Sequence, residues 1–170
     1  MDRHTAADRL RKEEHPASEE QTRNKNASRR FWEEVWNKGN VAVIADLVTA
    51  HQVSHDPNNP NQAPGPEGVR QLVSLYRNAF PDLHFQLDDV IAEGDRVVSR
   101  VTATGTHQRD LPGIPATNRR ASITGILIAR FEDGKIAENW ASFDFLGLLR
   151  QLGVAPEMAG APASTGPGGA

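Results

Sequence analysis

The sequence predicts a single α+β domain, with helices packed on one face of a curved antiparallel sheet. Two observations support this prediction. Apolar residues recur at helical spacing in the first half of the chain, whereas from Leu83 onward they alternate with polar residues. Helices followed by a meander of strands are typical of α+β folds. All ten aromatic residues fall between Phe31 and Phe145, so we expect the core to lie within that stretch.

The two ends of the chain have compositions that do not support a packed core. Residues 1–25 are dense in charge, with six Lys or Arg and six Asp or Glu, and residues 155–170 are rich in Ala, Gly and Pro. Such segments bury too little apolar surface to offset the entropy lost on ordering. We therefore predict disordered tails at residues 1–27 and 154–170 around one domain at residues 28–153.

Three helices are expected before the strands. The first begins after Ser28 as its N-cap and stops at Gly39, and a second short helix follows Asn40. The third begins near Pro66, because proline is favoured in the first turn of a helix. The three apolar faces hold Phe31, Trp32, Val35 and Trp36, then Val43, Ile44, Leu47 and Val48, and finally Val69, Leu72, Val73 and Tyr76.

The strands are located by their turns. Residues 51–66 contain four prolines and several asparagines, which predicts a loop after a possible short strand at 52–55. Glu93-Gly94-Asp95 and Asp133-Gly134 are typical of hairpin turns. A short amphipathic helix is expected at 145–152. The long strands are predicted from Leu83 to the first turn, at 96–107, at 120–131 and at 135–145.

Five motifs in this order, AFPDL, IAEGDRVVSRVTATGTH, GIPATNRR, RFEDGKIAENWASFD and LLRQLG, lie between Ala79 and Gly153. Over residues 31–153 the chain resembles the SnoaL-like polyketide cyclase (ester cyclase) family of the nuclear-transport-factor-2-like (NTF2-like) superfamily. The resemblance implies an NTF2-like conical barrel, whose curved antiparallel sheet has three N-terminal helices on its concave face. It also implies a cofactor-independent, acid/base-catalysed cyclisation of a hydrophobic polyketide intermediate in natural-product biosynthesis. A homodimer through the outer sheet face is implied as well, and it would explain the apolar run Ile126, Leu127 and Ile128.

Two histidines are candidates for proton transfer. His107 ends a strand just before a Pro/Gly loop, and an imidazole titrates near neutral pH. The alternative is a histidine that hydrogen-bonds the neighbouring loop, but the resemblance places the histidine of the GTH motif in the substrate pocket. His55 matches a histidine common in the family. We expect its neighbour Asp56 to be a turn residue before Pro57.

The last strand departs from the family pattern. The resemblance implies a catalytic aspartate directly after the tryptophan, and here that position is Ala141. Asp144 is the third catalytic candidate, provided that a bulge or bend turns it inward. Otherwise it caps the final helix near Gly147. Regular alternation places Asn139, Ala141 and Phe143 on one face and Trp140, Ser142 and Asp144 on the other.

A hydrophobic small-molecule substrate is the expected partner. The loop at 109–118 is long for a hairpin connection and apolar at its centre, so we expect it to rim the pocket. The predicted substrate-binding residues are Trp36, Tyr76, Leu111, Ile114, Asn139, Ala141 and Phe143.

Several classes of function are disfavoured by composition. The net charge of −3, without a basic patch among aromatic residues, argues against nucleic-acid binding. The absence of cysteine excludes disulfides and thiolate chemistry, and the six histidines form no metal-binding motif. We expect no cofactor, no metal, no membrane segment and a cytoplasmic location. Two alternatives to a cyclase remain. They are a non-catalytic ligand-binding dimer, and a hydrolase or hydratase acting on an epoxide-like intermediate, although Thr102 stands where epoxide hydrolases resembling this fold have an aspartate after Arg100.

Overall fold

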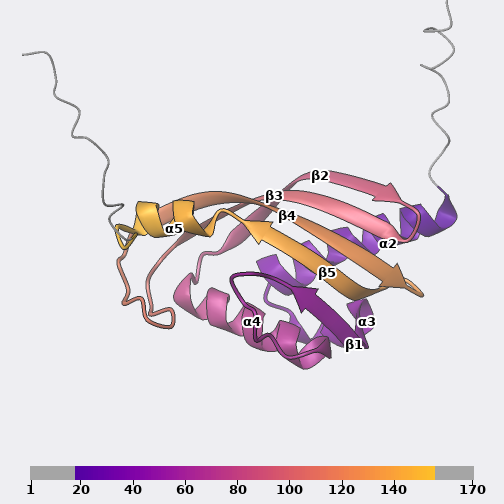
Figure 1. The fold of residues 1–170 in the computed structure, drawn as a ribbon, viewed down its shortest axis with the longest axis horizontal. Coiled ribbons are helices and arrows are strands. Elements are labelled where there is room, and N and C mark those ends of the chain that lie inside the picture. The colour runs from indigo at the N-terminus through magenta and orange to yellow at the C-terminus, as the bar shows by residue number, and fades with distance from the viewer. Residues whose placement is uncertain (1–17, 156–170) are drawn as a thin grey trace, which may run out of the picture.

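The computed structural model describes residues 18–155. The helices lie mainly in the first half of the chain, with one strand between the second and third predicted helices, and four strands and a short helix follow (Figure 1). Residues 1–17 and 156–170, which make up most of the predicted tails at 1–27 and 154–170, lie outside the described residues. The helical elements are α2 (Glu19–Arg30), the π-helix η1 (Phe31–Asn37), the 3₁₀ helix η2 (Val41–Val43), α3 (Ile44–Leu47), α4 (Gly65–Ala79) and α5 (Phe145–Leu152). The strands are β1 (Val48–His55), β2 (His84–Glu93), β3 (Arg96–Thr106), β4 (Arg120–Glu132) and β5 (Lys135–Phe143).

The five strands form one curved sheet in the order β1-β5-β4-β3-β2. Strands β2 to β5 make the predicted antiparallel meander, and this confirms the α+β class. The expectation of a wholly antiparallel sheet is wrong at one edge, because β1 pairs in parallel with β5. Such a pairing joins segments more than eighty residues apart, so no local turn signal announces it.

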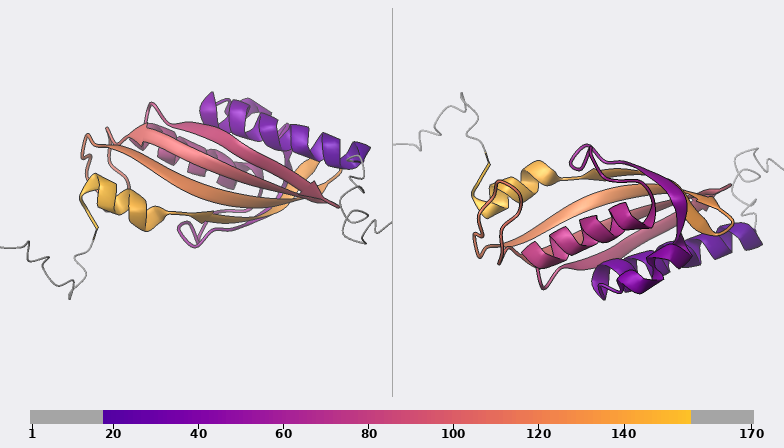
Figure 2. Two further views of the ribbon diagram at one scale, coloured as in Figure 1. Left: turned by 90° about the horizontal axis from the view of Figure 1, so that it is seen from above. Right: turned by 90° about the horizontal axis from the view of Figure 1, so that it is seen from below.

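The N-terminal helices cover the concave face of the sheet. Helix α4 crosses that face, and α2 runs beside β2 and β3 (Figure 2). Helix α5 packs against β4 at the end of the sheet from which the loop at 107–119 also emerges (Figure 1).

The first helix begins earlier than predicted. Ser18, not Ser28, is its N-cap, since the Ser18 hydroxyl accepts from the Gln21 backbone at 3.1 Å and Gln21 Oε1 accepts from the Ser18 backbone at 3.0 Å. Ser28 instead lies buried within the helix, where its hydroxyl hydrogen-bonds the Ser99 hydroxyl at 3.0 Å. The predicted disorder of residues 18–27 is therefore wrong, because tertiary contacts with the sheet order a segment of low hydrophobicity.

Beyond Arg30 the helix widens into the π-helix η1. Its apolar residues Phe31, Trp32, Val35 and Trp36 are all buried. The Trp32 and Trp36 rings lie 5.0 and 5.2 Å from the ring of Phe85 on β2. This aromatic cluster joins the first helix to the sheet and forms the centre of the main core. Among the described helices, none is long and apolar enough to cross a membrane.

Candidate active site

A cavity lies between the helices and the concave face of the sheet. The space open to the centres of water-sized molecules is about 140 Å³. Its walls are mainly apolar, which suits a largely hydrophobic ligand. The apolar and aromatic lining residues are Phe31, Trp32, Trp36, Val69, Leu72, Tyr76, Phe80, Leu83, Phe85, Ala103, Ala121, Ile123, Leu127, Ile136, Ala141, Phe143, Phe145 and Leu148.

One aromatic wall is held in place by a glycine. Phe143 on β5 pairs with Gly125 on β4, and its ring lies against the place where a side chain would begin. A Cβ atom built on Gly125 would overlap the ring, at 2.7 Å from Phe143 Cγ. The ring of Phe143 also meets Phe85 edge-on at 6.3 Å between centroids. Gly125 thus lets Phe143 lie close to the sheet, and this keeps the cavity open.

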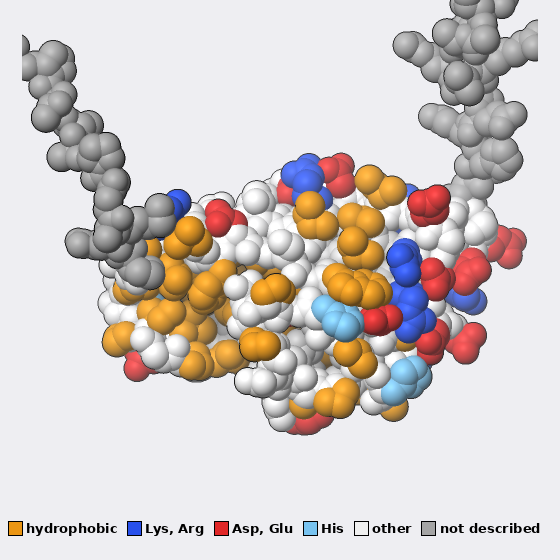
Figure 3. Space-filling model, in the orientation of Figure 1, with side chains coloured by type: hydrophobic (Ala, Val, Ile, Leu, Met, Phe, Trp, Pro, Cys, Tyr) orange, Lys and Arg blue, Asp and Glu red, His pale blue; other side chains and the backbone are white. Residues whose placement is uncertain are grey.

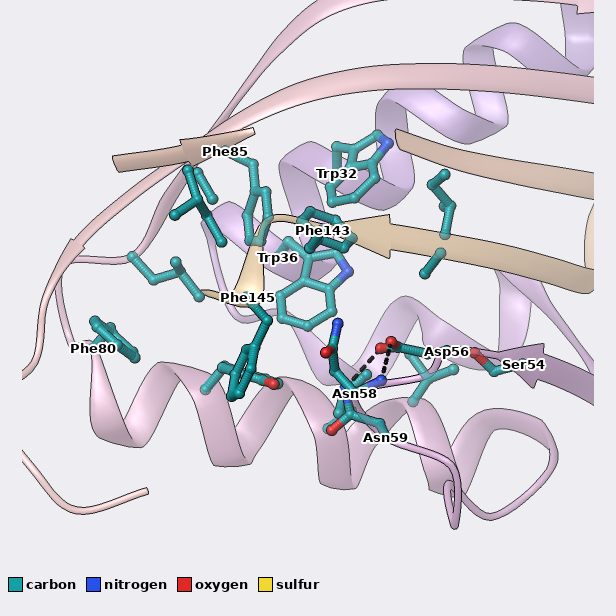
Figure 4. A pocket seen from close by; sticks show the side chains of 18 of the residues that line it. Trp32, Trp36, Ser54, Asp56, Asn58, Asn59, Phe80, Phe85, Phe143 and Phe145 are labelled. Carbon is teal, nitrogen blue, oxygen red and sulfur yellow. Dashed lines mark hydrogen bonds between the residues drawn. The ribbon is translucent and has the colours of Figure 1, made fainter. Parts of the chain in front are cut away.

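Most polar residues of the lining gather where β1 ends, whereas Thr104 lies on β3. Figure 4 shows Asp56, Asn58 and Asn59 together, apart from the group of Trp32, Phe85 and Phe143. Asp56 Oδ1 accepts from the Asn58 backbone at 2.9 Å, and Asp56 Oδ2 accepts from Asn59 Nδ2 at 2.6 Å. Asp56 is therefore the turn residue that the sequence predicts.

Asp56 also lines the cavity, which sequence reasoning missed. The signal was present in strand alternation. Ser54 and Asp56 share one face at the end of β1 and both line the cavity, whereas His55 between them faces outward. Among the residues that the structure describes, Asp56 is the one carboxylate of the lining.

A hydrogen-bonded chain orients Ser54 next to this cluster. The fully buried Gln52 donates to Asn139 Oδ1 at 2.6 Å, and Asn139 Nδ2 donates to Ser54 Oγ at 2.9 Å. Since the Ser54 oxygen accepts here, its own hydrogen is available to a ligand. Asn139 is therefore both a lining residue and the link between the two neighbouring strands.

Tyr76 on α4 completes the polar end. Burial raises the pKa of Tyr76, the nearby negative charge of Asp56 raises it further, and a hydrogen bond from Asn59 partly offsets both. The phenol consequently stays protonated over the whole neutral range and serves as a hydrogen-bond donor. It lines the cavity close enough to Asn59 and Asp56 for both to act on its pKa.

The structure brings together five of the ten residues that the sequence predicts for the site. They are Trp36, Tyr76, Asn139, Ala141 and Phe143, all of which line the cavity. The other five are His55, His107, Leu111, Ile114 and Asp144, and they do not belong to the lining. The faces predicted for the last strand are correct, since Asn139, Ala141 and Phe143 do point to the cavity side.

His55 lies on the outer face of the sheet. Its Nε2 is 2.9 Å from Glu138 Oε1, and its ring stacks on Trp140 at 5.3 Å between centroids. The expectation that His55 faces the pocket is wrong, because side chains alternate between the two faces from Gln52 to His55, and Ser54 takes the cavity side.

His107 is fully buried, but behind the cavity wall rather than in it. Its ring stacks on Phe80 at 5.1 Å, and Nδ1 lies 3.3 Å from the Thr117 hydroxyl. Its backbone bonds Asn118 and Arg119 at the far end of the loop, so the alternative reading of a loop-binding histidine fits the geometry. Leu111 and Ile114 pack into a second hydrophobic cluster with Phe80 and Leu148 instead of rimming the pocket.

His107 makes stability depend on pH. Burial lowers the pKa of His107, and the charge of Asp110 opposes this only partly. In the unfolded chain a histidine binds a proton below about pH 6.5, whereas the folded protein resists protonation until lower pH. We expect the free energy of unfolding to fall as the pH falls below about 6.5, measured by urea denaturation between pH 8 and 5. His107→Asn should flatten this dependence, and His84→Asn at an exposed position on β2 should not. An equal slope in wild type and His107→Asn would contradict the prediction.

Asp144 caps α5, as the second reading of the sequence predicts. Its Oδ1 accepts from the Gly147 backbone at 2.8 Å, and the side chain is exposed. We expect Asp144→Ala to lower the free energy of unfolding by about 1 kcal/mol through loss of the cap. Asp144→Asn, which retains a capping oxygen, should stay close to wild type in thermal melting. An equal loss of stability in both variants would show that the charge of Asp144, rather than its capping hydrogen bond, stabilises the helix.

Comparisons with known proteins agree with this architecture. The SnoaL-like polyketide cyclase family matches residues 26–152. The chain is 31% identical over 123 residues to the aklanonic acid methyl ester cyclase DnrD of Streptomyces peucetius, covering 71% of this chain and 84% of that protein. It is 37% identical over 91 residues to the nogalonic acid methyl ester cyclase of Streptomyces nogalater, covering 52% and 67%.

Solved structures show the same fold. The structure of TsrD from Streptomyces laurentii superposes with a TM-score of 0.72 at 32% identity, covering 78% of this chain and 96% of that one. The family match extends from the middle of α2 to the last residue of α5, so it includes every element that lines the cavity. The chain therefore belongs to the SnoaL-like polyketide cyclase family.

Proposed function

We propose that this protein closes a ring in a polyketide-derived ester by intramolecular attack of an enolate on a second carbonyl of the same molecule, without a cofactor. The observation that supports this most directly is an aromatic, apolar cavity with one polar end. The two curated relatives are named for methyl esters of aklanonic and nogalonic acid, and such substrates combine an apolar body with carbonyl groups. The cavity wall is divided in the same way, into a mainly apolar part and a polar end.

Such a cavity accelerates ring closure in two ways. Aromatic walls such as Trp36 and Phe143 hold a flexible chain folded, so that the two reacting carbons stay near each other. Exclusion of water strengthens every hydrogen bond that Ser54 or Tyr76 makes to a carbonyl oxygen. The walls thus supply proximity, and the polar end supplies charge stabilisation.

The test uses the two esters named above as probes. Wild type should convert at least one of them into a ring-closed isomer of unchanged mass, followed by chromatography and mass spectrometry. Ala141→Phe, which fills the cavity wall, should abolish conversion while thermal melting shows a folded protein. Binding of both esters without conversion would favour a non-catalytic binding protein, the reading supported by alanine at the position where the family resemblance implies an aspartate.

We further propose a homodimer through the outer face of the sheet. The left view of Figure 2 shows this face uncovered over β3, β4 and β5. Figure 3 shows apolar side chains gathered over the strands. Cross-strand neighbours place Trp140, Ile128, Val98 and Ile91 in one row, with Ile126 beside it. Ile91 is 64% exposed and Ile126 is 46% exposed, unusually high for isoleucine.

Light scattering at micromolar concentration should show a dimer for wild type. Ile126→Glu should give a folded monomer, because a carboxylate in the centre of an apolar interface is strongly disfavoured. Leu146→Glu, at an exposed site on α5, should remain dimeric. A monomeric wild type would overturn this proposal.

A further inference from the structure

Ala141 removes the carboxylate that the family resemblance implies, so the site needs another proton acceptor. On the basis of the proposed function, we propose that Asp56 is the general base that removes the proton α to a carbonyl, and that the Tyr76 hydroxyl hydrogen-bonds the resulting enolate oxygen. Both residues line the cavity, and they come from the end of β1 and from α4. Neither was a catalytic candidate on sequence grounds.

The Asp56 carboxylate is held in one orientation. Two hydrogen bonds, from the Asn58 backbone and from Asn59 Nδ2, fix one oxygen each. An ionised carboxylate has about four lone-pair sites, so each oxygen keeps one that can take a proton from a ligand. A side chain fixed by its neighbours in this way loses little freedom when it reacts.

Tyr76 and Asn59 connect this carboxylate to the ligand. The Asn59 side chain donates to Asp56, and Asn59 lies close enough to the Tyr76 phenol to lower its pKa. A protonated phenol has one hydrogen, which can be donated to a carbonyl in the cavity. The Asp56 carboxylate and the Tyr76 phenol both lie in the cavity wall, so they offer the proton acceptor and the hydrogen-bond donor that enolisation of a ketone requires.

The other titratable candidates lack this access. His55 points to the outer face, Asp144 caps α5 in contact with solvent, and His107 lies behind Phe80. Ala141 has no proton acceptor. Within residues 18–155, Asp56 thus combines a titratable acceptor with a place in the cavity wall.

The step is balanced without a co-reactant. The C–H bond α to the first carbonyl breaks, its proton goes to Asp56, and its electron pair moves into the enolate, whose oxygen accepts from Tyr76. The enolate carbon then forms a C–C bond with the second carbonyl carbon, and the π pair of that carbonyl becomes an alkoxide. The alkoxide takes the proton back from Asp56, so the product is an isomer of the substrate.

Two readouts in the full-length protein separate this inference from the proposed function. The first is deuterium uptake from D₂O into 2-tetralone, an aromatic ketone with acidic α-hydrogens, followed by NMR against a buffer blank. The second is ring closure of the aklanonic and nogalonic acid methyl esters. Asp56→Asn is the test variant, because asparagine still accepts from the Asn58 backbone. Asp144→Asn is the matched control, with the same chemical change outside the cavity.

Asp56→Asn should lower catalysed exchange by about a hundred-fold or more, and Asp144→Asn should leave it unchanged. Tyr76→Phe, which keeps the packing of the ring, should lower exchange by about a hundred-fold. It replaces Asp56→Asn as the test variant if Asp56→Asn does not melt cooperatively. Exchange that depends on Asp56 without closure of either ester would support the inference and contradict the proposed function. Exchange or closure at the wild-type rate in Asp56→Asn, or no exchange above buffer in wild type, would overturn it.

Discussion

Gly68→Ala should lower the free energy of unfolding by about 3 kcal/mol or more, at the upper end of the overpacking range. A Cβ atom at this position in the first turn of α4 would overlap the carbonyl oxygen of Ala63 and come within 2.6 Å of its carbon. These are backbone atoms, so the conflict is relieved only if the loop between β1 and α4 moves. That loop carries Asp56 and Asn59, and catalytic activity should therefore fall together with stability.

The measurement is urea denaturation at pH 7 of wild type, Gly68→Ala and a control on the same helix. Ser74→Ala is suitable because Ser74 is exposed on α4, and alanine there favours the helix slightly. Its free energy of unfolding should change by less than about 0.5 kcal/mol. A stable Gly68→Ala with normal activity would show that this loop adjusts freely and that Asp56 is not held as described.

Trp32→Ala should cost about 3–5 kcal/mol, the usual range for removing a large buried aromatic side chain. Only 3% of Trp32 is exposed, and its ring contacts Phe31, Trp36 and Phe85 at centroid distances of 5.9, 6.4 and 5.0 Å. A loss of this size is a large share of the stability of an ordinary domain.

Thermal melting followed by circular dichroism would measure this effect. Leu146→Ala offers a control, since 45% of Leu146 is exposed and its truncation should shift the free energy by less than about 0.5 kcal/mol. If Trp32→Ala melts like wild type, the aromatic cluster would be a lining of the cavity and not the centre of the core.

Local sequence signals located most of the helices and strands, because the residues that begin or end each of them lie within a few positions of its ends. The hairpin at Gly94, with φ of 55°, and the one at Gly134, with φ of 79°, begin and end strands where the turn residues predicted them. Alternation along β5 correctly separated its two faces, and Asn139, Ala141 and Phe143 lie on the side that the cavity occupies. The cap of α5 by Asp144 was also readable, because it needs only the Gly147 backbone three residues away.

The predictions that the structure contradicts failed for a different reason, because they concern contacts between distant segments. Residues 19–27 are too polar to predict a packed helix, and they are ordered because α2 packs against β2 and β3, where Ser28 hydrogen-bonds Ser99. The loop at 109–118 was expected at the pocket mouth, yet Leu111 is 6% exposed in a second core with Phe80 and Leu148. Both outcomes depend on partners distant in the chain.

From the sequence alone come the α+β class, the strand meander, several aromatic residues of the cavity wall, and the helix cap at Asp144 as one of two alternatives. These follow from periodicity and turn chemistry, which act over a few residues. The tertiary structure decided which polar groups meet in the cavity. It placed His107 behind Phe80 and His55 on the outer face, and it brought Asp56, Tyr76 and Asn139 to one end of the cavity. The physical reason is that residue type reveals which side chains can transfer a proton, whereas only the packing of β1, α4 and β5 against one another settles which of them reach the same enclosed space.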